Sequence, residues 1–287
     1  MPKQNSKKNI SVRIPKSVLI IAKILEFTSH TLAAKFAIKL FIKPVKFKIP
    51  KREQEMDNKS RQENIELPSL QKKIRVYHLG SEPKKALMVH GWSGRGTQLW
   101  SIAERLLQNG YSTISFDAPA HGKSTGATSD MTEFIVAIEE LDKLYGPFDI
   151  IIGHSLGAMA ALNAVKKGIS TEKVITIGSG DVIQDIINDF IQKLGMDIAI
   201  SKTMTKLFEM KFDQAVNNYS AYIAAREIAI PVLVIHDEDD EDVPVSAAKH
   251  IKRHLQNGEL LITKGLGHRK ILGDKKVIDK IIQFIKK

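Results

Sequence analysis

A serine between two glycines is the first group in this sequence that could do chemistry: Gly153-His154-Ser155-Leu156-Gly157. A short apolar run precedes it and a longer apolar stretch follows, so the serine lies on a sharp turn from a strand into a helix. Glycines flank such a turn because larger side chains would clash there. The turn exposes the Ser155 hydroxyl beside the first N–H groups of the helix. The pattern therefore predicts a nucleophilic serine.

Such a serine needs a general base, because a hydroxyl is a weak nucleophile at neutral pH. In a strand–turn–helix unit of this kind, the partners follow the serine in the order acid, then histidine. His268 lies in the glycine-rich stretch KGLGHRKI, directly after the last apolar run, ELLIT (259–263). A loop histidine past a strand end can reach a serine at the same sheet edge. His268 is therefore the predicted base.

The acid is expected after the apolar run PVLVIH, where acidic residues follow one another from Asp237 to Asp242. Asp240 is the predicted acid, because the chain must leave the strand and then turn into a helix after Pro244. Asp237 and Asp239 are the alternatives. A Ca²⁺ or Mg²⁺ site is a weaker interpretation of this run, because consecutive carboxylates cannot all face one ion. No metal is expected.

The oxyanion that forms during acyl transfer needs two N–H donors. One is expected from Leu156, the residue after the nucleophile, and the other from Trp92 in the loop HGWSGRGTQLW. Gly91 lets the backbone of that loop approach closely, and His90 supports the same motif. In a second loop, FDAPAHGKSTG (116–126), the side chains of Asp117 and His121 are expected to hold loop structure.

Short apolar runs alternate with helical patterns through residues 72–287. This alternation predicts an α/β fold with a mostly parallel sheet covered by helices on both faces. An insertion at about residues 182–228 contains further helical spacing, and it either covers a site at the sheet edge or is a packing excursion with no role of its own. The expected strands are residues 74–79, 86–90, 112–117, 149–153, 173–178, 231–236 and 259–263.

Five stretches carry a family resemblance, in this order along the chain: HGWSGRGTQL, FDAPAHGKS, GHSLGAMAA, IHDEDDEDVP and GLGHRKIL. Together they resemble the α/β-hydrolase superfamily, and in particular a bacterial group of serine hydrolases and esterases. The resemblance covers about residues 72–287. It implies the α/β-hydrolase fold with a helical cap, Ser155 as nucleophile, Asp240 as acid, His268 as base, and no cofactor.

Residues 1–71 differ from the rest in composition. Residues 1–50 hold eleven Lys and Arg and one acid (11 − 1 = +10), whereas the other residues hold 32 basic and 31 acidic side chains (32 − 31 = +1). This basic apolar arm, mainly residues 10–50, would suit an anionic membrane surface. Packing on the body or in a dimer fits equally well. Residues 51–71 are polar and are expected to be a linker or an exposed helix.

Composition excludes several classes. With no cysteine, the chain has no disulfide, thiolate metal site or cysteine nucleophile, and a cytoplasmic location is expected, either free or at the inner face of the membrane. No stretch has the roughly 18 uncharged apolar residues of a membrane span. Nucleic acid is a disfavoured partner, because aromatic residues do not alternate with the basic ones.

The predicted function is hydrolysis of a small-molecule carboxylic ester or thioester through an acyl-enzyme on Ser155. One alternative is a membrane-associated lysophospholipase or acyltransferase, favoured if the arm binds membranes. The other is a non-catalytic binding protein with a hydrolase fold. The acyl group, the leaving group and the oligomeric state stay open.

Overall fold

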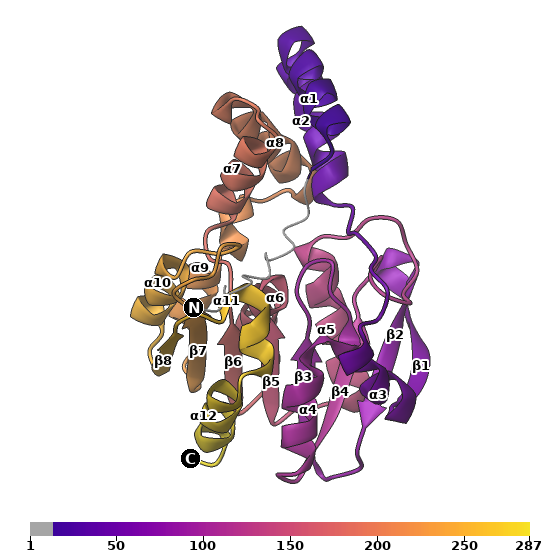
Figure 1. Ribbon diagram of the computed structural model, residues 1–287, viewed down its shortest axis with the longest axis vertical. Helices are drawn as coiled ribbons and strands as arrows, with labels where there is room; N and C mark the ends of the chain where they lie inside the picture. The colour runs from indigo at the N-terminus through magenta and orange to yellow at the C-terminus, as the bar shows by residue number, and fades with distance from the viewer. Residues whose placement is uncertain (1–13) are drawn as a thin grey trace, which may run out of the picture. The chain divides into compact units, whose positions relative to one another are not determined.

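Two compact units make up the described part of the chain, residues 14–287, in the computed structural model (Figure 1). Unit 1 combines the chain up to Leu40 with the segment Gln184–Asp213. Unit 2 combines Phe41–Ile183 with Gln214–Lys287. Each unit is therefore built from two stretches that are far apart in the sequence.

Unit 2 contains an eight-stranded sheet in the order β1-β2-β4-β3-β5-β6-β7-β8. The pairs β1/β2 and β2/β4 are antiparallel, and the pairs from β4/β3 to β7/β8 are parallel. This confirms the mostly parallel sheet predicted from the alternating pattern. The strands are β1 Arg61–Leu67, β2 Lys72–Leu79, β3 Lys84–Val89, β4 Tyr111–Asp117, β5 Ile150–His154, β6 Lys173–Ile177, β7 Val232–Asp237 and β8 Gly258–Thr263.

Helices cover both faces of this sheet, as Figure 1 shows. Helices α4 and α12 pack on each other on one side, and α5, α6, α9 and α10 form a connected series on the other. The helices of unit 2 are α3 Lys51–Lys59, α4 Trp100–Leu107, α5 Met131–Tyr145, α6 Leu156–Lys166, α9 Ala221–Glu227, α10 Ser246–His254, the short α11 Gly267–Lys270 and α12 Lys275–Ile285.

The central strands are apolar on both faces, as buried parallel strands must be. Alternate residues of each strand enter one core together with α4 and α12, for example Met88 in β3 and both Ile150 and Ile152 in β5. Intervening residues such as Ile151 are also fully buried. The parallel arrangement brings the carboxyl ends of β3, β5, β7 and β8 to one edge, where the loops with the candidate residues begin.

Residues 51–71 differ from the expected linker or exposed helix. They contain α3 and the edge strand β1, which pairs with β2 along its whole length from Arg61 to Leu67. Backbone hydrogen bonds hold this strand whatever its side chains are. Its outward positions face water and are polar, so the segment carries little of the apolar signal that identifies a central strand.

The described residues of unit 1 form four helices: α1 Lys16–Thr28, α2 His30–Phe41, α7 Ile183–Lys193 and α8 Ile198–Phe212. The part of the basic arm up to Leu40 and the part of the insertion from Gln184 to Asp213 thus belong to the same unit. The segment expected as the cap, residues 182–228, is split between the two units. Helices α7 and α8 belong to unit 1, whereas α9 packs on α6 and α10 in unit 2. The first part of the arm lies outside the described residues. None of the helices within 14–287 has the length and hydropathy needed to cross a membrane.

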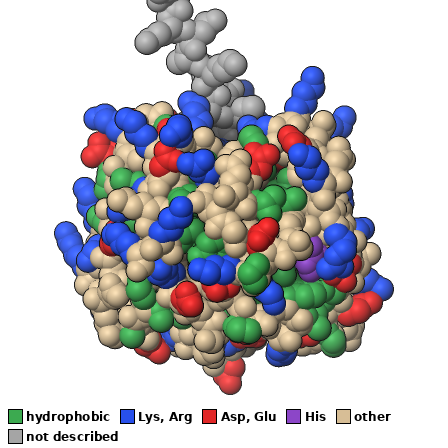
Figure 2. All heavy atoms as spheres, turned by 90° about the horizontal axis from the view of Figure 1, so that it is seen from below, with side chains coloured by type: hydrophobic (Ala, Val, Ile, Leu, Met, Phe, Trp, Pro, Cys, Tyr) green, Lys and Arg blue, Asp and Glu red, His purple; other side chains and the backbone are tan. Residues whose placement is uncertain are grey.

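Charge is mixed on the surface that Figure 2 shows. Lys and Arg side chains lie between acidic and hydrophobic ones there, and no face-wide patch of one sign forms. This agrees with the near neutrality of the sequence beyond residue 50 (32 − 31 = +1).

Candidate active site

Ser155 lies on the turn between β5 and α6, with φ of +53° and ψ of −120°. A non-glycine residue with this backbone geometry is strained, and such strain is concentrated at functional positions. Both flanking glycines are required by close packing. A Cβ on Gly153 would lie 2.5 Å from Ala158 Cα, and one on Gly157 would lie 2.3 Å from the carbonyl oxygen of His90. The turn predicted from the sequence is therefore present.

His268 and Asp240 form a close pair. His268 Nδ1 donates a hydrogen bond of 2.7 Å to Asp240 Oδ2, and the two side chains are 9% and 1% exposed. The other carboxylate oxygen of Asp240 accepts the N–H groups of Asp242 and Val243, each at 2.9 Å. Burial alone would raise the pKa of Asp240, but hydrogen bonds from His236 and His268 bring it below its usual value. The carboxylate is therefore charged, and because it accepts the hydrogen bond of Nδ1, Nε2 is the ring nitrogen of His268 that can accept a proton.

The two alternative acids have a different part in the structure. Asp237 Oδ1 accepts the N–H groups of the two residues before His268, at 3.1 and 2.9 Å. Asp239 Oδ2 accepts the N–H of Gly265 at 3.0 Å. Both carboxylates therefore hold the loop that carries His268, whereas Asp240 contacts the imidazole itself.

The loop of His268 lies against the turn of Ser155. His154, the residue before the serine, donates from Nε2 to the carbonyl oxygen of His268 at 2.9 Å, and the two rings are 4.7 Å apart between centroids. Burial lowers the pKa of His154 to about 3, so its ring is neutral. Gly178, with φ of +57°, allows a further close approach, because a Cβ there would lie 3.2 Å from His268 Nδ1.

The loop after β3 also reaches this turn. A Cβ on Gly91 would lie 2.9 Å from Ser155 Cβ, so only glycine fits at that position. The Gly91 N–H donates to Gln98 Oε1 at 3.0 Å, which fixes the loop. Among residues 14–287, the backbone N–H groups of Trp92 and Leu156 donate to no protein acceptor. Two free donors next to a nucleophile are what an oxyanion requires.

His90 connects two of the loops at the sheet edge. Its Nδ1 donates to the carbonyl oxygen of Gly91 at 2.7 Å, and its Nε2 accepts the N–H of Ala118 at 2.9 Å. Complete burial holds the pKa of His90 well below its ordinary value, which agrees with the neutral tautomer that this pattern needs. His90 therefore supports the loop and has no free nitrogen for chemistry.

Asp117 and His121 hold loop structure, as predicted. Asp117 accepts the N–H groups of Gly96 and Lys123, both at 2.7 Å, and the hydroxyl of Tyr77 at 2.9 Å. Burial raises the pKa of this carboxyl group. His121 Nδ1 bonds to the carbonyl oxygen two residues before it at 2.9 Å.

Sequence reasoning missed Glu53. This carboxylate on α3 is 3% exposed, accepts the hydroxyl of Thr97 at 2.9 Å and lies 3.8 Å from Arg95 Nε. Both partners belong to the loop that carries Trp92. The signal was weak, because α3 (KREQEMDNK) contains one apolar residue, Met56, three positions after Glu53. That spacing alone indicates which face of the helix is buried.

No metal centre competes with this interpretation within the described chain. Among residues 14–287, no group of three or more His, Asp or Glu side chains is placed to hold a metal ion. The run of carboxylates after β7 instead accepts hydrogen bonds from the backbone and from His268.

Comparisons with known proteins show the family and the fold. A family model described as "Alpha/beta hydrolase family" matches residues 86–274, whereas no curated protein matches the sequence. The chain is 19% identical to an esterase from Exiguobacterium antarcticum (TM-score 0.63; 79% of this chain, 100% of that chain). It is 15% identical to a thioesterase domain from the curacin biosynthetic pathway (TM-score 0.58; 79% and 99%). It is 14% identical to a membrane phospholipase A described as a bacterial virulence factor (TM-score 0.63; 94% and 96%).

Proposed function

Because the chain belongs to the α/β-hydrolase family, we propose that it is a serine hydrolase that cleaves carboxylic ester or thioester bonds through an acyl-enzyme on Ser155. One observation carries this proposal: the 2.7 Å hydrogen bond between His268 Nδ1 and Asp240, in a loop that packs against the strained serine turn. A buried carboxylate in this position selects the tautomer whose Nε2 accepts a proton.

The reaction would proceed in two halves. Ser155 Oγ bonds to the acyl carbon while its proton moves to His268 Nε2, and the alcohol or thiol leaves with that proton. Water then bonds to the acyl carbon, its proton moves to Nε2, and Oγ leaves with the proton as the carboxylic acid forms. The Trp92 and Leu156 N–H groups would donate to the oxyanion in both halves. Asp240 would stabilise the imidazolium.

The substrate would be a small acyl ester or thioester. Two of the similar folds carry these activities in their descriptions, an esterase and a thioesterase domain. Nothing in the proposed chemistry distinguishes the leaving groups, because an alkoxide and a thiolate both take their proton from His268. The choice between them is therefore a question for the assay.

A second candidate is a lipid ester, cleaved or transferred at the inner face of the membrane. The fold likeness to the membrane phospholipase A covers 94% of this chain, against 79% for the esterase. Helix α1 also exposes Ile20, Ile24 and Phe27 to water. A lysophospholipase or acyltransferase would use the same serine, with water or a second alcohol as acceptor.

Labelling with a fluorophosphonate probe tests the proposal. We expect the wild type to be labelled and Ser155→Ala not. Ser93→Ala is the matched control, because Ser93 is also partly exposed, also has positive φ (56°) and lies in the neighbouring loop after β3. The Ser93→Ala variant should still be labelled, because it retains Ser155. A folded wild type that is not labelled would contradict the proposal and favour a non-catalytic binding protein.

Turnover separates the two candidates. Ester substrates of graded acyl length and acyl thioesters would be compared with lysophospholipid as initial rates. Loss of every rate in Ser155→Ala is expected in all cases. Faster cleavage of lysophospholipid than of short soluble esters would favour the lipid candidate over the small-molecule one.

A further inference from the structure

Helix α1 exposes a stripe of large apolar side chains. Ile20, Ile24 and Phe27 follow each other at spacings of four and three residues, so they lie on one face of the helix. They are 60%, 58% and 94% exposed. The opposite face carries Ala22, which is fully buried. The helix is therefore anchored in unit 1 on one face and presents an uncovered apolar stripe on the other.

Lysines accompany this stripe on α1 and α2. Lys16 and Lys23 lie four and three residues to either side of Ile20, and Lys35 and Lys39 continue the charge on α2. Lys23 pairs with Glu26, the single acid of residues 14–40. An apolar stripe beside a net positive charge fits a surface that is both apolar and anionic.

The insertion contributes to the same unit. The N–H of Asp197, at the start of α8, donates to Glu26 on α1. This contact joins the turn between α7 and α8 to α1 at the residue before Phe27. The following residue, Ile198, is a further exposed apolar side chain. The insertion therefore adds an exposed apolar side chain to the unit that also contains the stripe of the arm.

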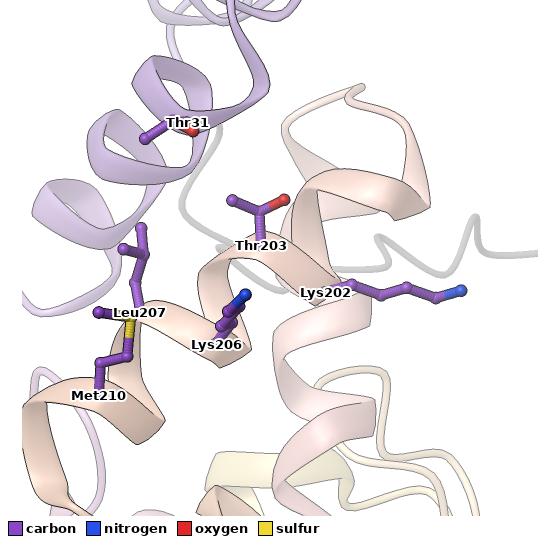
Figure 3. Close-up of a pocket in the computed structure, with 6 residues that line it drawn as sticks. All are labelled: Thr31, Lys202, Thr203, Lys206, Leu207 and Met210. Atoms are coloured by element: carbon purple, nitrogen blue, oxygen red, sulfur yellow. The ribbon is translucent and has the colours of Figure 1, made fainter.

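A groove of about 450 Å³ lies between α2 and α8 (Figure 3). Thr31 lines it from α2, and the other lining residues come from α8. Lys202 and Lys206 are exposed and pair with no acid among residues 14–287. Hydroxyl groups and ammonium groups beside apolar side chains suit a phosphate on a lipid headgroup. The lining residues are Thr31, Lys202, Thr203, Lys206, Leu207 and Met210.

We infer that unit 1 docks on an anionic lipid bilayer. The stripe of Ile20, Ile24 and Phe27 enters the boundary between headgroups and acyl chains, and the lysines of α1, α2 and α8 bind anionic headgroups. A second copy of the chain is a poorer occupant, because a two-fold interface would place the lysines of one surface against those of the other. Nucleic acid would not cover an isoleucine stripe. This docking goes beyond the proposed catalysis and does not depend on it.

Vesicle flotation tests the inference on the full chain. The Ser155→Ala variant is used beside the wild type, so that hydrolysis of the lipid cannot affect binding. We expect both to float with vesicles of equal parts phosphatidylglycerol and phosphatidylcholine and to stay unbound with phosphatidylcholine alone. Binding to the anionic vesicles should weaken in 0.5 M salt.

Two variants separate the contributions. Phe27→Glu should weaken binding at least tenfold, because it places a charge where an apolar ring enters the bilayer. Lys202→Gln combined with Lys206→Gln should weaken it about fivefold for each lysine, the effect of one basic residue near an anionic surface. If the lysine pair has no effect, the insertion does not take part and the composite surface is wrong.

Matched changes in unit 2 serve as controls. Leu144→Glu alters an apolar side chain that is 50% exposed on α5, and Lys249→Gln with Lys276→Gln removes two exposed lysines. Neither should alter flotation. The inference would be overturned if these controls weakened flotation as much as the unit 1 variants do. It would also be overturned if the wild type bound neutral vesicles as well as anionic ones. A wild-type dimer that Phe27→Glu converts to a monomer would also overturn it, in favour of a second copy of the chain.

Discussion

Replacement of Asp240 by asparagine tests the proposed catalytic pair most directly. The amide keeps the size of the carboxylate and can still accept the N–H groups of Asp242 and Val243 through its oxygen. It removes the negative charge that lies 2.7 Å from His268 Nδ1. It also permits the opposite tautomer, whose Nε2 carries a proton and cannot take one from Ser155.

The size of the effect follows from the geometry. At 2.7 Å and an effective dielectric constant of about 20, a full imidazolium charge attracts the carboxylate by about 6 kcal/mol. Both side chains are almost completely buried, so solvent screens little of this attraction. Since about 1.4 kcal/mol corresponds to tenfold in rate, Asp240→Asn should lower kcat/KM by about 10⁴-fold.

The assay is the hydrolysis of whichever ester the wild type cleaves, measured as kcat/KM for Asp240→Asn, Asp237→Asn and Asp239→Asn. The last two should retain activity within about tenfold, because their oxygens hold backbone N–H groups that an asparagine oxygen also accepts. If kcat/KM of a folded Asp240→Asn variant fell by less than tenfold, this reasoning would be refuted. A fall in kcat/KM for Asp237→Asn as large as that for Asp240→Asn would refute it as well.

Two further predictions concern stability. Glu53→Ala should lower the free energy of unfolding in urea by about 1–3 kcal/mol, since the buried Thr97 hydroxyl loses its acceptor; Glu55→Ala, exposed on the same helix, should change it by less than about 0.5 kcal/mol, and equal effects would contradict this. Burial lowers the pKa of His154 to about 3 and that of His121 to about 4, whereas an unfolded histidine titrates near 6.5. The unfolded state therefore gains protons first as the pH falls, and stability should drop by about 2 kcal/mol per histidine between pH 7 and pH 5. Urea titrations of wild type and His121→Gln should differ in this slope, and equal slopes would argue against it.

Local chemistry made part of the site predictable. Gly153 and Gly157 mark a turn that no larger residue permits. The position of Ser155 therefore follows from the apolar run, the glycine-flanked turn and the longer apolar stretch, in that order along the chain. His268 was predictable because it is the histidine directly after the last apolar strand. The central strands carry continuous apolar runs, and these identify buried parallel strands wherever the partners lie.

Other features depend on contacts that the sequence does not encode locally. Asp237, Asp239 and Asp240 have the same side chain in one acidic run, and only the path of the loop decides which of them meets His268. Strand β1 is held by backbone pairing at a sheet edge. The apolar spacing of α1 indicates that one face is covered, but it cannot show that α1 shares a compact unit with an insertion beyond residue 183.

The construction of unit 1 from two distant stretches has a consequence for biosynthesis. Helices α1 and α2 leave the ribosome first, but the unit is complete only when residue 213 has been made, roughly 170 residues after Leu40. At about 5–20 residues per second, that interval lasts on the order of 10–35 s. During it, α1 and α2 lack the segment Gln184–Asp213, with which they form one compact unit in the finished protein. The nascent chain therefore exposes apolar residues of α1 and α2 until translation has passed the insertion, and these residues must be shielded from other chains during that time.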